Sequence, residues 1–136
     1  MGDKLSGVNV GDVLKIYFPA HKPEGHEQEG TRPAIVVGVP DTLGKPRFPV
    51  LVVVPLTSQL EEWAKNSPTL YPVLEVGAGG VDVPSVALTD QVRAVGVSRI
   101  TGRYGTLTSV QLGPVKDALF KLLEMSRPPA KVTMRR

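Results

Sequence analysis

The sequence contains no cysteine among its 136 residues. This absence excludes a disulfide framework, a zinc site with thiolate ligands and a cysteine nucleophile. Aromatic residues are scarce as well, and the seven that are present are scattered, so the sequence shows no platform on which bases could stack. The two histidines, His21 and His26, have no ligand spacing to a carboxylate cluster. We therefore predict no metal site and expect no cofactor.

Long hydrophobic runs are also missing. The longest strongly apolar stretch covers residues 48–56 and is interrupted by two prolines. It is far shorter than the roughly 18 residues that a membrane-spanning helix requires. The first residues lack the apolar segment of a secretion signal. We expect a cytoplasmic protein without a membrane partner.

An excess of one charge sign is nearly absent, because 16 Lys and Arg stand against 13 Asp and Glu, which gives a net charge of +3. This balance allows a nucleic acid as a partner but does not argue for one. The excess lies in residues 127–136, which hold four basic residues and no acidic residue. We expect residues 1–125 to form a single domain and residues 126–136 to form a basic, flexible tail.

Most of the domain has the composition of β-strands. Residues 12–18 alternate between two faces, and residues 48–56 are continuously apolar, as in a central strand that is buried on both sides. We expect a short helix at residues 58–65, where Ser58 and Glu61 have the spacing of a capping box. A longer amphipathic helix is expected at residues 109–125, with Pro114 in its first turn. The other expected strands are residues 32–39, 71–76, 85–89 and 93–100, with a turn at residues 77–80.

These elements indicate a mainly β, α+β fold, namely a small antiparallel barrel with a short inserted helix and a C-terminal helix. One loop between two of its strands, at residues 24–33, concentrates the polar residues that could perform chemistry. Pro33 restricts Arg32 to an extended conformation, and such an arginine is suited to hold a phosphate. His26 titrates near neutral pH, and Glu27 could orient it or act as a base. The alternative is a solvated polar connection without a function.

Two further segments carry candidate side chains. Thr57 and Ser58 end the most apolar strand, where they could cap the short helix or help its N-terminus to bind an anion. Asp90 and Gln91 lie between two strand-like runs, where turn formation competes with contacts to base edges.

Taken together, these motifs resemble the MazF/PemK/Kid family of toxin endoribonucleases from toxin–antitoxin pairs. The resemblance runs from about Gly11 to about Leu123. It rests on Gly11-Asp12-Val13, on the string GHEQEGTRPA at residues 25–34, on Pro55-Leu56-Thr57-Ser58, and on Asp90-Gln91 with the later Arg93 and Ser98-Arg99-Ile100. The string HEQxGTRP, followed by PLTS at a suitable distance, is specific to this family, whereas neither part alone would be.

The resemblance implies an SH3-like barrel, a homodimer and RNA cleavage without a metal or cofactor. The essential arginine and threonine of the family fall on Arg32 and Thr57, and its loop histidine and glutamate fall on His26 and Glu27. Its Asp-Gln pair falls on Asp90 and Gln91. With Gln28, Ser58 and Arg93, this pair is expected to contact RNA, and Arg99 and Arg103 are possible helpers.

The chain departs from the family at Leu88, where Kid-like members carry an arginine implicated in catalysis. The prediction is therefore a MazF-like cleavage of single-stranded RNA that uses Arg32 and Thr57 and leaves a 2′,3′-cyclic phosphate. A cognate antitoxin is the expected protein partner. Two alternatives stay open: a toxin of the same barrel that binds DNA gyrase and cuts nothing, and a degenerate member that binds RNA or antitoxin without turnover.

Overall fold

The computed structural model describes residues 7–20, residue 25 and residues 30–125. Three of the candidate residues, His26, Glu27 and Gln28, lie outside the described residues, as does the basic tail at residues 126–136. No helix in the described part of the chain is long and apolar enough to cross a membrane.

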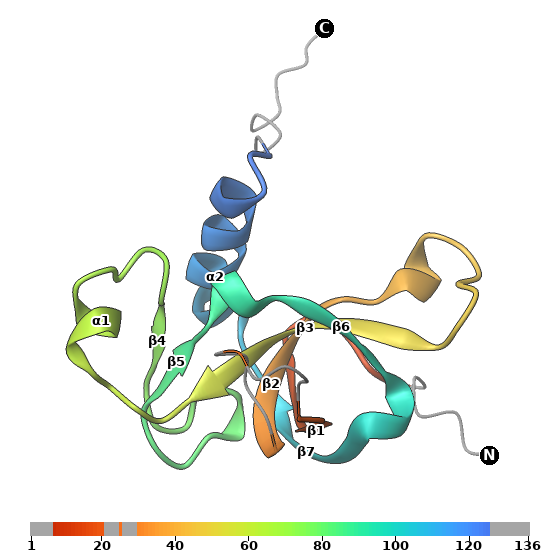
Figure 1. Ribbon diagram of the computed structural model, residues 1–136, viewed down its shortest axis with the longest axis horizontal. Coiled ribbons are helices and arrows are strands. Elements are labelled where there is room, and N and C mark those ends of the chain that lie inside the picture. The colour runs from red at the N-terminus through yellow and green to blue at the C-terminus, as the bar shows by residue number, and fades with distance from the viewer. Residues whose placement is uncertain (1–6, 21–24, 26–29, 126–136) are drawn as a thin grey trace, which may run out of the picture.

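A mainly antiparallel sheet forms the body of the protein and curls into a half-barrel with a C-terminal helix (Figure 1). The strand order along the sheet is β4-β5-β3-β2-β1-β7, and β6 pairs separately with β3. The predicted fold class is confirmed. The strands are β1 (Asp12–Phe18), β2 (Gly30–Gly38), β3 (Val50–Thr57), β4 (Val73–Leu74), β5 (Ser85–Ala87), β6 (Arg93–Gly96) and β7 (Ile100–Thr106).

Both faces of the central strands are buried, because each face packs against a different layer. Val13, Ile35 and Val54 face one apolar cluster, which also includes Leu112 and Val115 of the C-terminal helix α2 (Ser109–Leu122). Residues of the opposite parity form a second cluster inside the curl of the sheet: Leu14, Ile16, Phe18, Ala34, Val36, Leu51, Val53 and Val95. This double burial explains the continuously apolar sequence of β3.

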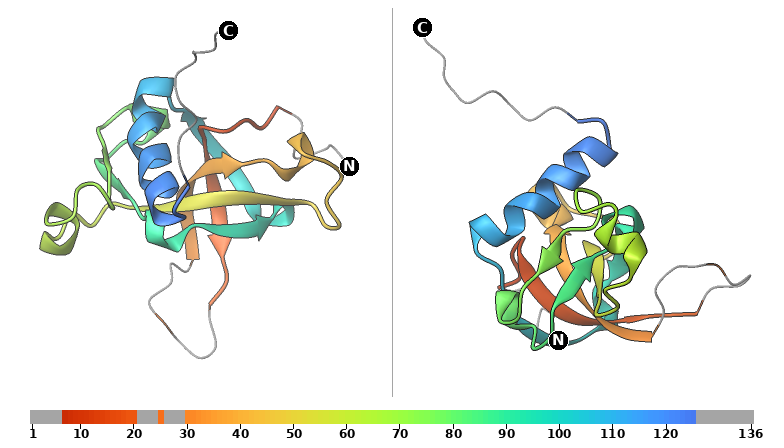
Figure 2. Two further views of the ribbon diagram at one scale, coloured as in Figure 1. Left: turned by 90° about the horizontal axis from the view of Figure 1, so that it is seen from above. Right: turned by 90° about the vertical axis from the view of Figure 1, so that its left-hand side faces the viewer.

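The ends of α2 differ in part from the sequence-based expectation. The helix begins after Thr108, whose side chain accepts a hydrogen bond from the Gln111 backbone N–H while the Gln111 side chain accepts one from the Thr108 backbone. This capping box was not predicted, and it places Pro114 in the second turn instead of the first. Leu122 and Leu123 were expected on the buried stripe but are 41% and 56% exposed, because the helix extends beyond the sheet at this end (Figure 2).

Several other expected elements have different boundaries, and the expected strands at residues 71–76 and 85–89 are shortened to β4 and β5. The short helix α1 covers only Glu62–Lys65, and Glu61 at its N-cap makes no side-chain capping bond. The expected strand at residues 93–100 is divided into β6 and a 3₁₀ turn, Val97–Arg99, after which β7 runs as a strand that was not predicted. Phe48 lies outside β3 and is 64% exposed.

Glycines join the loop after β4 to strand β7. The predicted turn at residues 77–80 is confirmed and contains the 3₁₀ helix Ala78–Gly80. A Cβ atom on Gly80 would lie 2.2 Å from the Tyr104 carbonyl oxygen, and Gly80 has a φ of 84°. Only glycine fits this crossing without displacing the backbone of one of the two segments.

The charged residues divide between two parts of the molecule. Residues 7–20, 30–57 and 92–106, which we call the basic region, contain β1, β2, β3, β6 and β7, with seven basic and two acidic residues. Residues 58–91 and 107–125, the acidic region, contain α1, β4, β5 and α2, with three basic and seven acidic residues. A nearly neutral domain therefore carries two regions of opposite charge.

Candidate functional site

The start of β2 and the end of β3 lie together because the two strands pair antiparallel. Ala34 pairs with Pro55 at the end of their ladder, so the same register continued by two residues sets Arg32 opposite Thr57. On its other edge Thr57 pairs with Val86 of β5. Two motifs that are 25 residues apart in the sequence thus meet at one end of the sheet.

Arg32 and Thr57 line a common cavity of about 200 Å³. Ser58 also lines it, so the structure brings together three of the predicted site residues. The remaining wall comes from both charge regions, with Thr31, Pro33, Leu56 and Tyr104 on the basic side and Val81, Asp82, Val83 and Ser85 on the acidic side. The cavity therefore lies on the boundary between the two regions.

The Thr57 hydroxyl is held in a defined orientation. The residue is only 6% exposed, and its Oγ1 atom accepts a hydrogen bond of 3.2 Å from the Gln59 backbone N–H. Because this bond occupies a lone pair, the hydroxyl hydrogen is directed elsewhere, and it has no acceptor among the described residues. Thr57 is thus a buried hydroxyl donor at the cavity wall.

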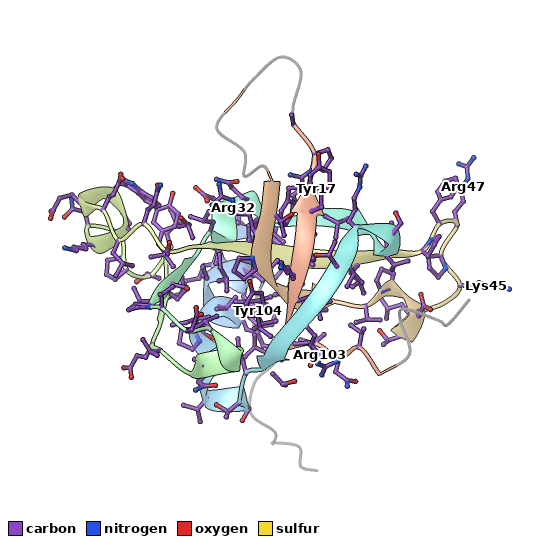
Figure 3. The ribbon with its side chains drawn as sticks, turned by 90° about the horizontal axis from the view of Figure 1, so that it is seen from below. Tyr17, Arg32, Lys45, Arg47, Arg103 and Tyr104 are labelled. Carbon is purple, nitrogen blue, oxygen red and sulfur yellow. The ribbon has the colours of Figure 1, made fainter. Side chains whose placement is uncertain are left out.

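Arg32 lies near the start of β2, as the Arg-Pro sequence predicts. It pairs with Ile16 of β1, and Pro33 pairs with Lys15, so the backbone on which the guanidinium is carried is part of the sheet ladder. The side chain is exposed (Figure 3). A cation that is anchored on a strand and open to solvent can meet a phosphate without first being released from the protein core.

The predicted anion site at a helix N-terminus is wrong. Residues 58–61 have no helical structure, so Ser58 does not cap α1, which begins at Glu62. Thr57 forms a local turn with Gln59 instead. The sequence suggested a helix because Ser58 and Glu61 have capping spacing, but the chain uses these residues to leave the sheet.

Asp90 and Gln91 do not line this cavity. They lie in the 3₁₀ helix Thr89–Gln91, where the Tyr71 hydroxyl donates a 2.6 Å hydrogen bond to the Asp90 carboxylate. This bond, followed by burial and the charge of Asp90, raises the pKa of Tyr71 to about 12. Trp63 packs edge-on against Tyr71 with ring centroids 5.0 Å apart. The predicted turn is therefore confirmed, and the contact of this pair with RNA stays a prediction.

Two neighbouring positions also have structural partners. The Arg93 guanidinium lies 5.2 Å from the centre of the Phe18 ring, at the end of β1 from which the 19–29 connection departs. Leu88, where the resemblance leads one to expect an arginine, is 3% exposed and packs with Ala64 and Val86 in a small apolar cluster. This apolar packing leaves no place for a guanidinium at position 88.

Among the lining residues that the sequence analysis missed, two have side chains that could take part in chemistry, Asp82 and Tyr104. Asp82 follows the glycine turn, and Tyr104 lies on the strand that was not predicted. The sequence does offer one clue, because Gly79-Gly80 and Gly105 are small enough to let two backbones approach each other. Within the described residues, no three His, Asp or Glu side chains gather as a metal-binding group.

Comparisons with known proteins support the fold and show the family. Residues 9–123 match the family model described as PemK-like, MazF-like toxin of type II toxin–antitoxin system. A crystal structure of MazF from Deinococcus radiodurans is similar at a TM-score of 0.66 and 24% identity, over 87% of this chain and 97% of that one. A MazE–MazF structure from the same organism has a TM-score of 0.64 and 26% identity, over 88% and 97% of the two chains.

A more distant solved structure is described as an endoribonuclease in complex with its cognate antitoxin from Mycobacterial species. It has a TM-score of 0.62 and 16% identity, and the match covers 89% of this chain and 97% of the other. A search among curated proteins finds no match.

Proposed function

Because the chain belongs to the PemK-like, MazF-like family of type II toxin–antitoxin toxins, we propose that it is an endoribonuclease that cuts single-stranded RNA. The observation that carries this proposal is the single cavity lined by Arg32 and Thr57, a cation and a buried hydroxyl donor from two separate motifs. Both groups suit a phosphodiester whose charge increases during reaction. We propose messenger RNA as the substrate and, with it, the cytoplasm as the place of this activity.

In the proposed reaction the 2′-oxygen of the RNA attacks the adjacent phosphorus. The bond from the 2′-oxygen to phosphorus forms as the bond from phosphorus to the 5′-oxygen breaks, which leaves a 2′,3′-cyclic phosphate and a 5′-hydroxyl. The proton of the 2′-hydroxyl goes to a base, and the 5′-oxygen takes up a proton. Negative charge gathers on the phosphoryl oxygens, where Arg32 and Thr57 stabilise it.

The general base has three candidates. His26 and Glu27 are those that the resemblance implies. Asp82 is added because it is the carboxylate that the described residues bring to the cavity. A base in such a reaction contributes roughly 10²–10⁴-fold to the rate. Comparing the pH–rate profiles of Glu27→Gln, His26→Ala and Asp82→Asn identifies the base, because only its variant loses the limb that reports its titration.

The partners follow from the family and from its solved relatives. Structures of MazE–MazF and of an endoribonuclease with its cognate antitoxin support an antitoxin as the inhibitor of this toxin. We propose a homodimer for the active protein, and an antitoxin segment that covers the RNA-binding surface. Sedimentation of the purified toxin, alone and with antitoxin, tests both assignments.

The decisive experiment incubates the purified protein with a long RNA in the presence of EDTA. Discrete cuts that end in 2′,3′-cyclic phosphates are expected, and a 2′-deoxy substitution at the cut site should abolish cleavage there. Uncut RNA together with retained toxicity would instead favour the gyrase-binding alternative. Tight RNA binding without product would favour the degenerate one.

A further inference from the structure

The connection between β2 and β3, residues 39–49, extends away from the sheet at the opposite side of the molecule from α1 (Figures 1 and 2). We call it the arm. It contains the 3₁₀ helix Pro40–Thr42 and buries little of its surface, since Leu43 is 95% exposed and Phe48 is 64% exposed. These two apolar side chains are therefore open to contact with a partner.

The tip and the returning side of the arm are basic. Lys45 and Arg47 are exposed, and the Arg47 guanidinium lies 5.1 Å from the centre of the Phe48 ring. Asp41 is the single acidic residue of the arm and lies on its outgoing side. No carboxylate of the described residues forms a salt bridge with Lys45 or Arg47, in contrast to Arg103, which pairs with Asp12 at 3.2 Å.

The surface between the arm and the cavity also presents cations beside an aromatic ring. Tyr17 is 42% exposed on β1, and the Arg99 guanidinium lies 5.6 Å from the centre of its ring. Lys15 is exposed on the same strand. Figure 3 shows Arg32 and Tyr17 on neighbouring strands, with Lys45 and Arg47 on the arm to one side. Strand β3 begins where the arm ends and has eight residues, the last of which is Thr57. The arm and the cavity are therefore about 25 Å apart along this strand.

We propose that the arm is a second binding site for single-stranded RNA, which holds the substrate at a distance from the cut. The proposal rests on the proposed function, because it assumes an RNA that reaches the cavity. Exposed aromatic rings beside cations bind single strands by stacking bases and neutralising phosphates. Phe48 supplies the ring, and Lys45 and Arg47 supply the cations.

The aromatic ring distinguishes RNA from an acidic peptide as the partner. An acidic antitoxin segment would be attracted by Lys45 and Arg47 but would gain little from the exposed face of a phenyl ring. A nucleobase has a π-face for that ring, and each stacked base contributes about 1–3 kcal/mol to binding. Variants that remove the ring alone or the charges alone therefore distinguish RNA from an acidic peptide as the partner.

The test uses the full chain and two RNAs, a long transcript and a minimal oligonucleotide that spans only the cut. The variants are Phe48→Ser and the double change Lys45→Gln with Arg47→Gln. The matched control is Lys65→Gln with Lys116→Gln, which removes two exposed cations from the acidic region. Both arm variants should raise KM on the long RNA about 5-fold or more with kcat retained. The KM of the arm variants on the minimal RNA should not change. The KM of the control variant should not change on either RNA.

An unchanged KM for both arm variants on a long RNA that the wild-type protein cuts would overturn the arm proposal and leave the proposed function intact. If the wild-type protein cuts no RNA, the proposed function fails. Fluorescence anisotropy then tests the arm proposal by itself, by measuring the binding of a labelled oligouridine and of polyglutamate to the wild type and the arm variants. Weaker oligouridine binding by Phe48→Ser supports the proposal. Loss of polyglutamate binding alone, through the charge variant, would assign the arm to an acidic protein partner and overturn it.

Discussion

The basic and acidic regions of this small domain differ in more than charge. The basic region contains the longest strands, β1, β2, β3 and β7, and three of its cations lie over aromatic rings: Arg47 over Phe48, Arg93 over Phe18 and Arg99 over Tyr17. The acidic region combines the 14-residue helix α2 with the short elements α1, β4 and β5, and polar bonds link Tyr71 with Asp90 and Trp63 with Glu61. The two regions meet at the cavity, where Arg32 and Thr57 come from the basic region and Asp82 from the acidic region.

The largest effect is expected where the two regions meet in the cavity. Arg32→Ala should lower the cleavage rate about 100–1000-fold, because a preorganised donor to the transition-state charge is lost. Thr57→Val should act in the same direction, and Thr57→Ser should retain activity because it keeps the hydroxyl. Single-turnover cleavage of a defined RNA measures these rates.

Circular dichroism must show that both inactive variants remain folded. Lys65→Gln, in the acidic region, provides a control whose rate should equal that of the wild type. A folded Arg32→Ala protein with the normal rate would place the chemistry elsewhere in the molecule.

The largest loss of stability is expected at the close contact between Gly80 of the acidic region and the Tyr104 carbonyl of the basic region. Gly80→Ala should destabilise the fold by about 3 kcal/mol or more, since the new Cβ would collide with the Tyr104 carbonyl and a left-handed backbone would carry a side chain. Gly77 has a φ of 95° but no atom within 4 Å of its would-be Cβ, so Gly77→Ala should cost only about 1 kcal/mol. Urea unfolding distinguishes the two, and equal losses would refute the steric argument.

A buried carboxylate holds together the strands of the basic region. Asp12 is 1% exposed and accepts hydrogen bonds from the Asn9 backbone N–H and the Thr106 hydroxyl, besides its ion pair with Arg103. Asp12→Ala should lower the free energy of unfolding by about 3 kcal/mol, because these donors lose their acceptor. Asp41→Asn, on the exposed arm, should change it by less than about 0.5 kcal/mol. Thermal unfolding of the pair provides the measurement.

The charge division itself predicts how RNA binding depends on salt. Lys15→Gln and Arg99→Gln should each reduce the slope of log K against log salt concentration by about 0.7, as one phosphate contact is lost. Glu61→Gln and Glu62→Gln, in the acidic region, should leave the slope unchanged. Anisotropy titrations at several salt concentrations, on an uncut RNA, test this contrast, and equal slopes for all four variants would show that the charge division does not govern binding.

The smallest effect concerns a tyrosine of the acidic region. The pKa of Tyr71 is raised to about 12, so its protonated form is favoured in the folded protein. Its stabilising contribution should be complete below the ordinary tyrosine pKa of about 10 and disappear as the pH rises towards 12. Ultraviolet titration should show one tyrosine ionising later than the others, and Asp90→Asn should reduce the delay to the part that burial causes. An undiminished delay in Asp90→Asn would assign it to another tyrosine.

Much of the sheet follows from the local sequence. Strand β1 occupies the range that its alternation predicts, and β3 is central because an uninterrupted apolar sequence needs two buried faces. The main omission is β7, whose sequence ITGRYGT has no apolar alternation. Its pairing with β1 and its glycine crossing hold it in the sheet, and these long-range contacts are invisible in a local pattern.

The candidate site was predicted only in part. Arg32, Thr57 and Ser58 do share a cavity, but their assignment depended on a resemblance between motifs and not on their spacing in the chain. Asp90 and Gln91 belong to a turn held by Tyr71, and Asp82 and Tyr104 enter the cavity from segments with no motif of their own. A residue that is brought to a site by the packing of distant segments belongs to no local sequence pattern that would identify it.

By itself, the sequence determined the family, through a resemblance between motifs. It also determined the class of fold and the separation of the Arg-Pro and Leu-Thr-Ser motifs into two strands, because hydrophobic periodicity and proline act on neighbouring residues. Only the tertiary structure decided that Arg32 and Thr57 line one cavity, since that depends on the register of two strands. It also divided a nearly neutral chain into a basic and an acidic region and left Phe48 exposed on the arm. These properties depend on which distant segments become neighbours, and that is the outcome of burying both faces of the sheet.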